Sequence, residues 1–198
     1  MPEKLRLRFE KTGRAIYISH LDLMRTMQRV FLRADCPLKY SEGFNPHALI
    51  SILLPLSVGV GSVCELMDFQ LREDVDLAAL PERLTAVMPE GIRALEAYPA
   101  GRKVRELKWL RVTGRYEYDR AEPAEMAQKL SAFYARDAIV ITRKTKRGEG
   151  QMDIVPAIAE LHIRPEDTCV TVEAVVSAQE PTLNPDHLVA ALQQLAPE

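Results

Sequence analysis

KLRLRFEKTGRAIYISHLDLMRTMQRVFLR, residues 4–33, changes its hydrophobic period once along its length. Over residues 4–9 apolar and basic side chains alternate strictly, which predicts a β-strand with one buried face. From Ser19 onward the apolar residues recur every three or four positions, which predicts an amphipathic helix over the rest of the stretch. Ser19 is a suitable N-cap, and Asp22 lies near the positive end of the helix. The stretch therefore predicts a strand followed by a helix.

The elements expected next complete a recognisable order. After a short extended piece at residues 15–18 and the helix, we expect two strands, a second helix with Pro81 in its first turn or at a kink, and a closing strand. The order strand, helix, strand, strand, helix, strand is the split βαβ pattern of a ferredoxin-like half. The strands are predicted at 49–54 and 63–71, the helix within 76–88 and the closing strand at 92–98.

The second half of the chain repeats this order with looser spacing. LTAVMPE at residues 84–90 resembles LQQLAPE at residues 192–198, and each segment lies at the second helix of its half. We therefore expect an α+β protein with two ferredoxin-like βαββαβ halves in tandem, residues 1–100 and 101–198, the second apparently missing its last strand and so leaving an open sheet edge. Its predicted elements are a strand at 106–118, a helix at 123–134, an extra strand at 138–142, strands at 154–163 and 168–176, and a helix at 184–195.

Composition excludes several classes of protein. Hydrophobic residues make up 47% of the chain and charged residues 27%, which is typical of a globular protein. No apolar run approaches the roughly 20 residues of a membrane-spanning helix, and the N-terminus lacks the apolar segment of a signal peptide. The cytoplasm is therefore expected. Cys36, Cys64 and Cys169 lie far apart and form no CxxC pair, so buried reduced thiols are expected, with no metal held by the cysteines and no cofactor.

Charge is segregated along the chain although the formal net charge is only −2. Residues 1–50 carry nine basic and five acidic side chains, and residues 101–150 carry thirteen basic and seven acidic ones. The segment 51–100 has three against eight, and 151–198 has one against eight. Because segregated charge creates a local potential, the two basic quarters are candidates for binding an anionic partner.

The basic side chains fall on defined elements. Arg25, Arg29 and Arg33 are spaced four apart and line one helix face. Phosphate backbones are a common partner of such surfaces, but a solvated face or a docking face for an acidic partner is also open. The residues we predict to contact RNA are Arg6, Arg8, Arg25, Arg29, Arg33, Arg143, Lys144, Lys146 and Arg147, the last four in a loop expected to be flexible.

Polar residues are also dense between residues 18 and 68. Gly43 and the Asn45–Pro46 pair favour a tight turn in the loop before an apolar strand. His20 and His47, with Asp22 or Glu42 nearby, are candidates for an acid–base pair. A metal site, a structural network and ligand or RNA recognition without chemistry remain open. The full motif set is Ser19, His20, Asp22, Arg25, Tyr40, Ser41, Gly43, Phe44, Asn45, Pro46, His47, Glu65 and Asp68.

The order of these motifs resembles one known family. RLRFEKTG at residues 6–13 is followed by SHLDLMR at 19–25, YSEGFNPH at 40–47, PLSVGVGS at 55–62 and ELMD at 65–68. This order is similar to that of the radical SAM-linked proteins, a domain fused to or encoded beside cobalamin-binding radical SAM proteins. The resemblance is strong over residues 4–98, and it implies a radical SAM protein as partner.

The chain departs from the family pattern at two points. Ala48 and Leu49 follow His47 where the family has Pro-Lys, and Val155 stands where the family has Arg in an Asp-Ile-Arg-Pro segment. Both departures weaken a catalytic interpretation more than a structural one.

Three functions follow from the sequence as alternatives. The first is an accessory RNA-binding protein for a radical SAM enzyme in tRNA or rRNA modification. The second is an enzyme that uses His20 or His47 on RNA or on a small phosphorylated substrate. The third is a protein-docking module that binds no nucleic acid.

Overall fold

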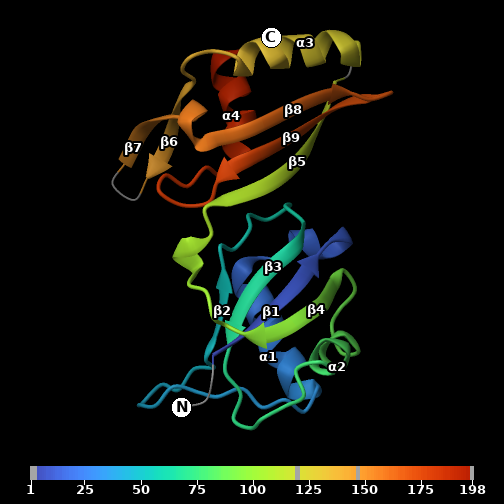
Figure 1. The fold of residues 1–198 in the computed structure, drawn as a ribbon, viewed down its shortest axis with the longest axis vertical. Helices are drawn as coiled ribbons and strands as arrows, with labels where there is room; N and C mark the ends of the chain where they lie inside the picture. The colour runs from blue at the N-terminus through green and yellow to red at the C-terminus, as the bar shows by residue number, and fades with distance from the viewer. Residues whose placement is uncertain (1–3, 119–120, 146–147, 197–198) are drawn as a thin grey trace. The chain divides into compact units, whose positions relative to one another are not determined.

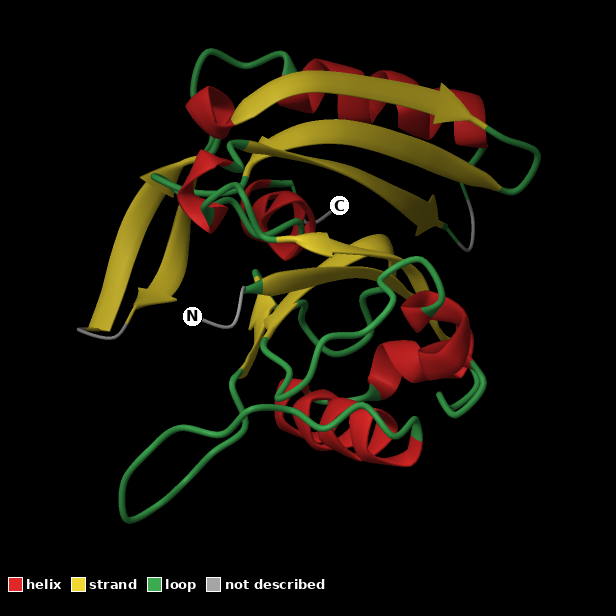
Figure 2. Ribbon diagram, turned by 60° about the horizontal axis from the view of Figure 1, so that its bottom comes forward, coloured by secondary structure: helices red, strands yellow, loops and turns green. Residues whose placement is uncertain are grey.

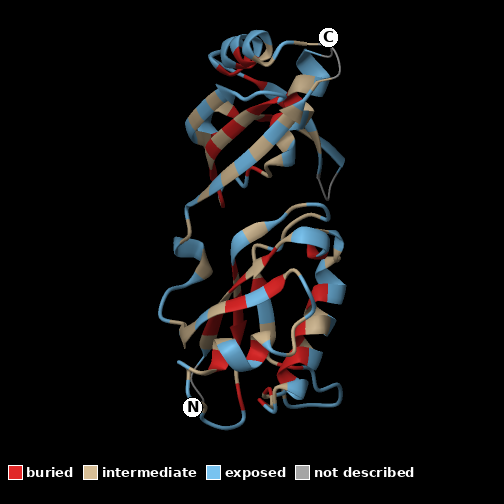
Figure 3. Cartoon of the chain, turned by 90° about the vertical axis from the view of Figure 1, so that its right-hand side faces the viewer, coloured by how far each residue is buried: buried red, intermediate tan, exposed pale blue. Residues whose placement is uncertain are grey.

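The computed structural model describes residues 4–118, 121–145 and 148–196. The chain divides into two compact units, unit 1 at Met1–Val104 and unit 2 at Arg105–Glu198 (Figure 1). Each unit has a hydrophobic core of its own, which Figure 3 shows as buried residues gathered inside it. Within the described residues there are four α-helices and three antiparallel sheets, so the predicted α+β class is confirmed.

Unit 1 is a four-stranded antiparallel sheet with two helices. The strand order is β2-β3-β1-β4, so the first strand lies inside the sheet, between β3 and β4. Figure 2 shows both helices on one side of this sheet. The elements are β1 (Leu5–Lys11), the 3-10 helix η1 (Gly13–Tyr17), α1 (His20–Arg33), β2 (Ile50–Leu53), β3 (Ser62–Phe69), α2 (Leu80–Thr85) and β4 (Ile92–Pro99).

The core of unit 1 follows from the alternation in β1. Leu7 and Phe9 are fully buried and pack with Met27 and Phe31 of α1. The helix begins where the sequence predicts, because the Ser19 side chain accepts a hydrogen bond from the backbone N–H of Asp22 at 3.2 Å. These contacts hold α1 against the sheet and leave its opposite face exposed.

Unit 2 has a three-stranded sheet of order β5-β9-β8 and a separate β6–β7 hairpin. Its helices α3 and α4 are joined by a hydrogen bond of 2.9 Å from the Tyr134 hydroxyl to the Leu188 carbonyl. The elements are β5 (Trp109–Glu117), α3 (Pro123–Tyr134), β6 (Val140–Thr145), β7 (Gly148–Asp153), the 3-10 helix η3 (Val155–Ala157), β8 (Ile158–Pro165), β9 (Cys169–Ser177) and α4 (Asp186–Leu195). A 3-10 helix, η2 (Val104–Glu106), precedes them.

The second helix lies within the predicted range 76–88, and Pro81 lies in its first turn, one of the two expected places. Two local predictions were wrong. Residues 15–18 were expected to be extended, but Gly13–Tyr17 forms η1, beginning at a glycine with φ of +53°. The basic segment expected as a flexible loop belongs largely to β6, which pairs with β7 through residues such as Arg143 and Gly150. Lys146 and Arg147 lie outside the described residues.

The long apolar helix of a membrane span does not occur among the residues that the structure describes.

Candidate nucleic-acid interface

A groove of about 500 Å³ lies on the outer face of α1. One wall is the helix itself, through side chains spaced three and four apart, and the other is the segment that follows it together with the end of the sheet. Because helical residues at these spacings share a face, the four helix side chains form one continuous wall. The lining residues are Arg25, Gln28, Arg29, Leu32, Pro37, Leu38, Tyr40 and Arg72.

Arg72 reaches this groove because the chain after β3 is held to the segment after α1. Leu38 and Leu71 form an isolated antiparallel bridge, and both side chains are buried. The Arg72 N–H donates to the Pro37 carbonyl at 3.0 Å. With Leu71 anchored in the core, the neighbouring Arg72 is directed outward, where it is exposed.

Arg72 lies over the Tyr40 ring, with its guanidinium carbon 5.7 Å from the ring centroid. This is a cation–π contact at its outer range. Tyr40 is 43% exposed and Leu32 is 77% exposed, so the groove offers apolar surface beside its three arginines. A site of this composition can bind a phosphate group and stack a planar ring at the same time.

The YSEGFNPH motif forms a loop that closes on itself beside the groove. The Ser41 N–H donates to the His47 carbonyl at 2.9 Å, and the His47 N–H donates to the Ser41 hydroxyl at 3.1 Å. The Ser41 hydroxyl also lies 2.8 Å from Nδ1 of His47. Residues 42–47 are all exposed, and Phe44 is the most exposed large hydrophobic residue described in the chain. His47 therefore closes an exposed loop and precedes β2, which begins at Ile50.

The SHLD motif caps α1. Besides accepting the Asp22 N–H, the Ser19 hydroxyl donates to the Asp22 carboxylate at 2.7 Å, and Arg25 donates to the same carboxylate at 3.1 Å. These hydrogen bonds, first from Ser19 and then from Arg25, lower the pKa of Asp22. His20 is exposed in the first turn. The side-chain hydrogen bonds of Asp22 and of His47 each stay within their own motif.

The basic residues of β1 are neutralised by acidic neighbours on the sheet. Arg6 and Asp68 lie opposite each other in the β1–β3 register, and both are buried. Arg6 donates to Asp68 from Nε at 2.6 Å and from Nη2 at 3.2 Å, while Lys4 lies 2.6 Å from the same carboxylate. Burial alone would raise the pKa of Asp68, but the hydrogen bonds from Arg6 and Lys4 outweigh it and lower that pKa.

Arg8 pairs with Glu96 of β4 at 3.4 Å. Arg6 and Arg8 of β1 and the preceding Lys4 thus lie on one face, as the alternation of residues 4–9 predicts, but that face is not an open cationic surface. Arg6 and Arg8 can meet RNA only by exchanging an existing carboxylate partner.

Two more charged residues are buried on the other face of the sheet. Lys11 and Glu65 are 2% and 6% exposed, and the Lys11 ammonium lies 3.4 Å from the Ile16 carbonyl of η1. Burial raises the pKa of Glu65, against a hydrogen bond from Ser62 and the charge of Lys11. Burial likewise lowers the pKa of Lys11. The sequence motif included Glu65 but missed Lys11.

The other predicted cations that the structure describes, Arg33, Arg143 and Lys144, are not among the lining residues of the groove. Arg33 is exposed at the end of α1 but does not line the groove. In unit 2, Arg143 donates to the Thr182 carbonyl at 3.5 Å, and Lys144 is exposed on β6. Sequence reasoning missed Arg72, although it is one of only three basic residues in the acidic segment 51–100.

In the part of the chain that the structure describes, the cysteines do not gather with other side chains into a metal centre. Cys36 and Cys169 are buried and Cys64 is exposed, all as free thiols. Within 4–118, 121–145 and 148–196, no three His, Cys, Asp or Glu side chains gather as a metal site.

The fold and this site define an α+β protein with an arginine-lined groove, beside a loop that carries exposed aromatic residues. The chain belongs to a bacterial family described as "Uncharacterized protein conserved in bacteria (DUF2344)", whose model matches residues 4–185. Among curated proteins, none matches the chain.

Proposed function

We propose that this protein binds unpaired RNA through unit 1, in the groove between α1 and the segment that ends at Tyr40. The observation that carries the proposal is the convergence of Arg25, Arg29 and Arg72 on one groove that also exposes a tyrosine ring. Guanidinium groups pair with phosphates in a fixed geometry, and aromatic rings stack on any base.

The size and composition of the groove favour a single strand over a duplex. Its volume of about 500 Å³ is in the range of sites for small molecules, and so suits one nucleotide. Stacking on Tyr40 requires a base that is free of its neighbours, as in loops, bulges and ends of RNA. Phe44, exposed on the loop that leaves the groove at Tyr40, supplies a second ring for the next base.

The distribution of ion pairs in unit 1 also favours the outer face of α1 as the RNA-binding face. On the sheet, the cations of β1 already have carboxylate partners, and the pair between Arg6 and Asp68 is buried. On α1, Arg29 is exposed and only Arg25 shares its charge with Asp22, in a surface pair of 3.1 Å. Because solvent screens an exposed ion pair and leaves it weak, a phosphate can replace Asp22 at little cost.

The biological role rests on the family resemblance of the motifs. We propose that the bound RNA is presented to a radical SAM enzyme that modifies tRNA or rRNA. The three thiols lie far apart in the sequence and form no CxxxCxxC cluster motif, so the radical chemistry belongs to the partner.

We also infer that both units are ferredoxin-like halves. In unit 1 the support is the βαββαβ order with strands arranged β2-β3-β1-β4. In unit 2, β5, β8 and β9 correspond to the first three strands, with α3 and α4 in the places of α1 and α2. The β6–β7 hairpin is then an insertion.

The test is the affinity for a fluorescent single-stranded RNA of mixed sequence, with DNA of the same sequence alongside. We expect saturable binding that the Arg25→Ala/Arg29→Ala/Arg72→Ala variant loses. The control removes the same charge outside the groove, at the exposed residues Arg102, Arg105 and Arg115. Equal loss in both variants, or binding to DNA alone, would overturn the proposal.

A further inference from the structure

Unit 2 has an open sheet edge at β5. Within the part of the chain that the structure describes, β5 pairs only with β9, and no strand lies on its other side. Half of the backbone N–H and C=O groups of such a strand point away from the sheet. This edge can therefore accept another strand.

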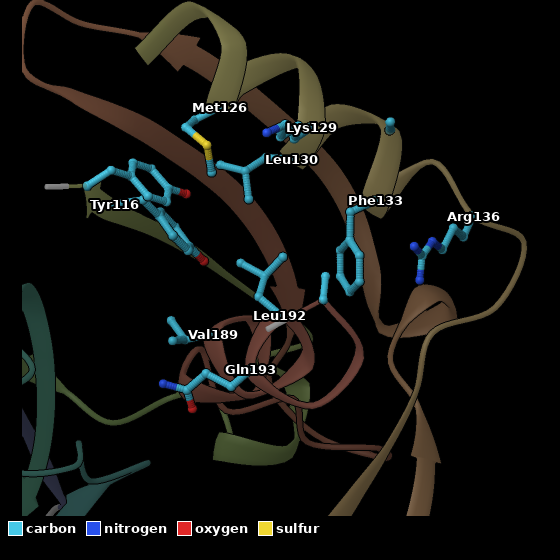
Figure 4. A pocket seen from close by; sticks show the side chains of 12 residues that line it. Tyr116, Met126, Lys129, Leu130, Phe133, Arg136, Val189, Leu192 and Gln193 are labelled. Carbon is cyan, nitrogen blue, oxygen red and sulfur yellow. The ribbon is translucent and has the colours of Figure 1, made fainter. Parts of the chain in front are cut away.

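An apolar groove of about 560 Å³ lies beside this edge. Figure 4 shows it between α3 and α4, with Met126, Leu130 and Phe133 on one side and Val189 and Leu192 on the other. Tyr116 and Tyr118, at the end of β5, also line it. The groove thus exposes the edge of the unit 2 core.

In unit 1, a fourth strand occupies the position beside the first strand that is open in unit 2. There β4 pairs antiparallel with β1, through partners such as Phe9 and Ala94. The inward side chains Ile92 and Ala94 of β4 are buried in the core of unit 1, and α2 packs on this strand. This step rests on the inferred correspondence of the two units. It indicates that an extended segment with apolar residues at alternate positions fills the groove.

The charges around the edge indicate which residues should lie between the apolar positions of this segment. Arg111 and Arg115 are exposed on the outward face of β5, and Lys129 and Arg136 are exposed at the groove. Arg111 pairs with Glu160 and Lys129 with Glu125, at 3.3 Å and 2.8 Å, in surface pairs that exchange readily. In an added strand with its apolar side chains in the groove, the alternate acidic side chains point to the outward face and would meet Arg111 and Arg115.

We propose that unit 2 binds a partner protein by strand addition: an extended partner segment of alternating apolar and acidic residues pairs with β5 and places its apolar side chains in the groove between α3 and α4. Backbone hydrogen bonds supply affinity in this mode of recognition, and the pockets for alternate side chains supply specificity. The interaction uses no residue of the RNA groove.

The probe is a short synthetic peptide in which valine and glutamate alternate, added to the full chain. Hydrogen exchange read by mass spectrometry is expected to slow over residues 109–117 and not over β1. A peptide of the same residues with all valines at one end, and one that alternates valine with lysine, should bind at least about tenfold more weakly, a difference of about 1.4 kcal/mol.

Val189→Glu places a charge in the groove at a side chain that is 43% exposed, so folding is preserved. The affinity for the alternating peptide should fall by at least about tenfold in this variant. The matched control is Val140→Glu, outside the groove on β6 and 44% exposed, which should bind as the wild type.

Three results would overturn the proposal. The first is equal affinity for the alternating peptide and for the peptide with all valines at one end. The second is equal affinity of Val189→Glu and the wild type for the alternating peptide. The third is concentration-dependent protection of β5 without peptide, because a second copy would then occupy the edge. RNA affinity, measured on the same variants, reports separately on unit 1.

Discussion

The guanidinium of Arg72 lies over the ring of Tyr40, although 32 positions of the numbering separate the two residues. The contact joins the end of the β3 segment to the base of the exposed loop and closes one side of the groove on α1. It gives the groove a planar cation whose geometry lysine does not reproduce.

Arg72→Lys keeps the charge and removes the planar group. We expect RNA affinity to fall roughly threefold to tenfold, because a cation–π contact contributes about 0.5–2 kcal/mol and bidentate phosphate pairing is lost with it. Fluorescence anisotropy measures the effect, with Arg102→Lys as the control. Indistinguishable affinities of the two variants would remove Arg72 from the interface.

Phe44→Ala tests the exposed loop. A base stacked on an aromatic ring contributes about 1–3 kcal/mol, so RNA affinity should fall by at least about fivefold. The midpoint of urea unfolding should not move, because Phe44 buries no surface in the core. Tyr17→Ala is the matched control, since Tyr17 is an aromatic residue outside the groove with 71% of its surface exposed. The same loss of affinity in both variants would contradict a specific role for the loop.

Asp68 tests the buried pair on the sheet. Asp68→Ala leaves Arg6 buried without its partner and should lower the free energy of unfolding by about 3–5 kcal/mol. Replacing both residues, as Arg6→Met/Asp68→Leu, should recover most of the loss. Urea unfolding followed by circular dichroism measures both variants. A double variant no more stable than Asp68→Ala would show that the unpaired Arg6 is not the cause of the lost stability.

The pH dependence of this pair has a definite sign. Because the pKa of Asp68 is lowered in the folded state, its stabilisation is present above the unfolded value of about 3.9 and is lost as pH falls through the lowered folded value. The stability advantage of the wild type over Asp68→Asn should therefore shrink below about pH 4. An advantage that stays constant across this range would contradict the lowered pKa.

Glu65, on the opposite face of β3, should show the reverse dependence. Its folded pKa is raised by burial, so the stabilisation is present below the unfolded value of about 4.3 and is lost as pH rises through the raised folded value. Relative to Glu65→Gln, the wild type should lose stability as pH rises from about 4, as measured by urea unfolding at each pH. A gain in stability over this range would be incompatible with the raised pKa.

Local signals in the sequence predicted most of the fold. The α3 helix spans the predicted residues 123–134, and α1 begins at its predicted N-cap, Ser19, because caps and hydrophobic periods act over a few residues. The 3-10 helix η1 was missed since its β-branched and aromatic residues, such as Ile16 and Tyr17, also suit an extended chain.

The sequence was less informative about the site. The helix arginines could be predicted from their spacing. The groove that contains Arg25 and Arg29 could not, because its third arginine, Arg72, is brought there by the bridge between Leu38 and Leu71. The pairing of Arg6 with Asp68 depends on the cross-strand register, which no local pattern specifies.

The salt dependence of RNA binding tests the central proposal most directly. The logarithm of the association constant should fall linearly with the logarithm of salt concentration, by about 0.7 for each neutralised phosphate of a single strand. For Arg25→Ala/Arg29→Ala/Arg72→Ala, any residual slope should be shallower by about 2 than in the wild type. A variant that keeps both the affinity and the slope of the wild type would contradict the assignment of RNA to this groove.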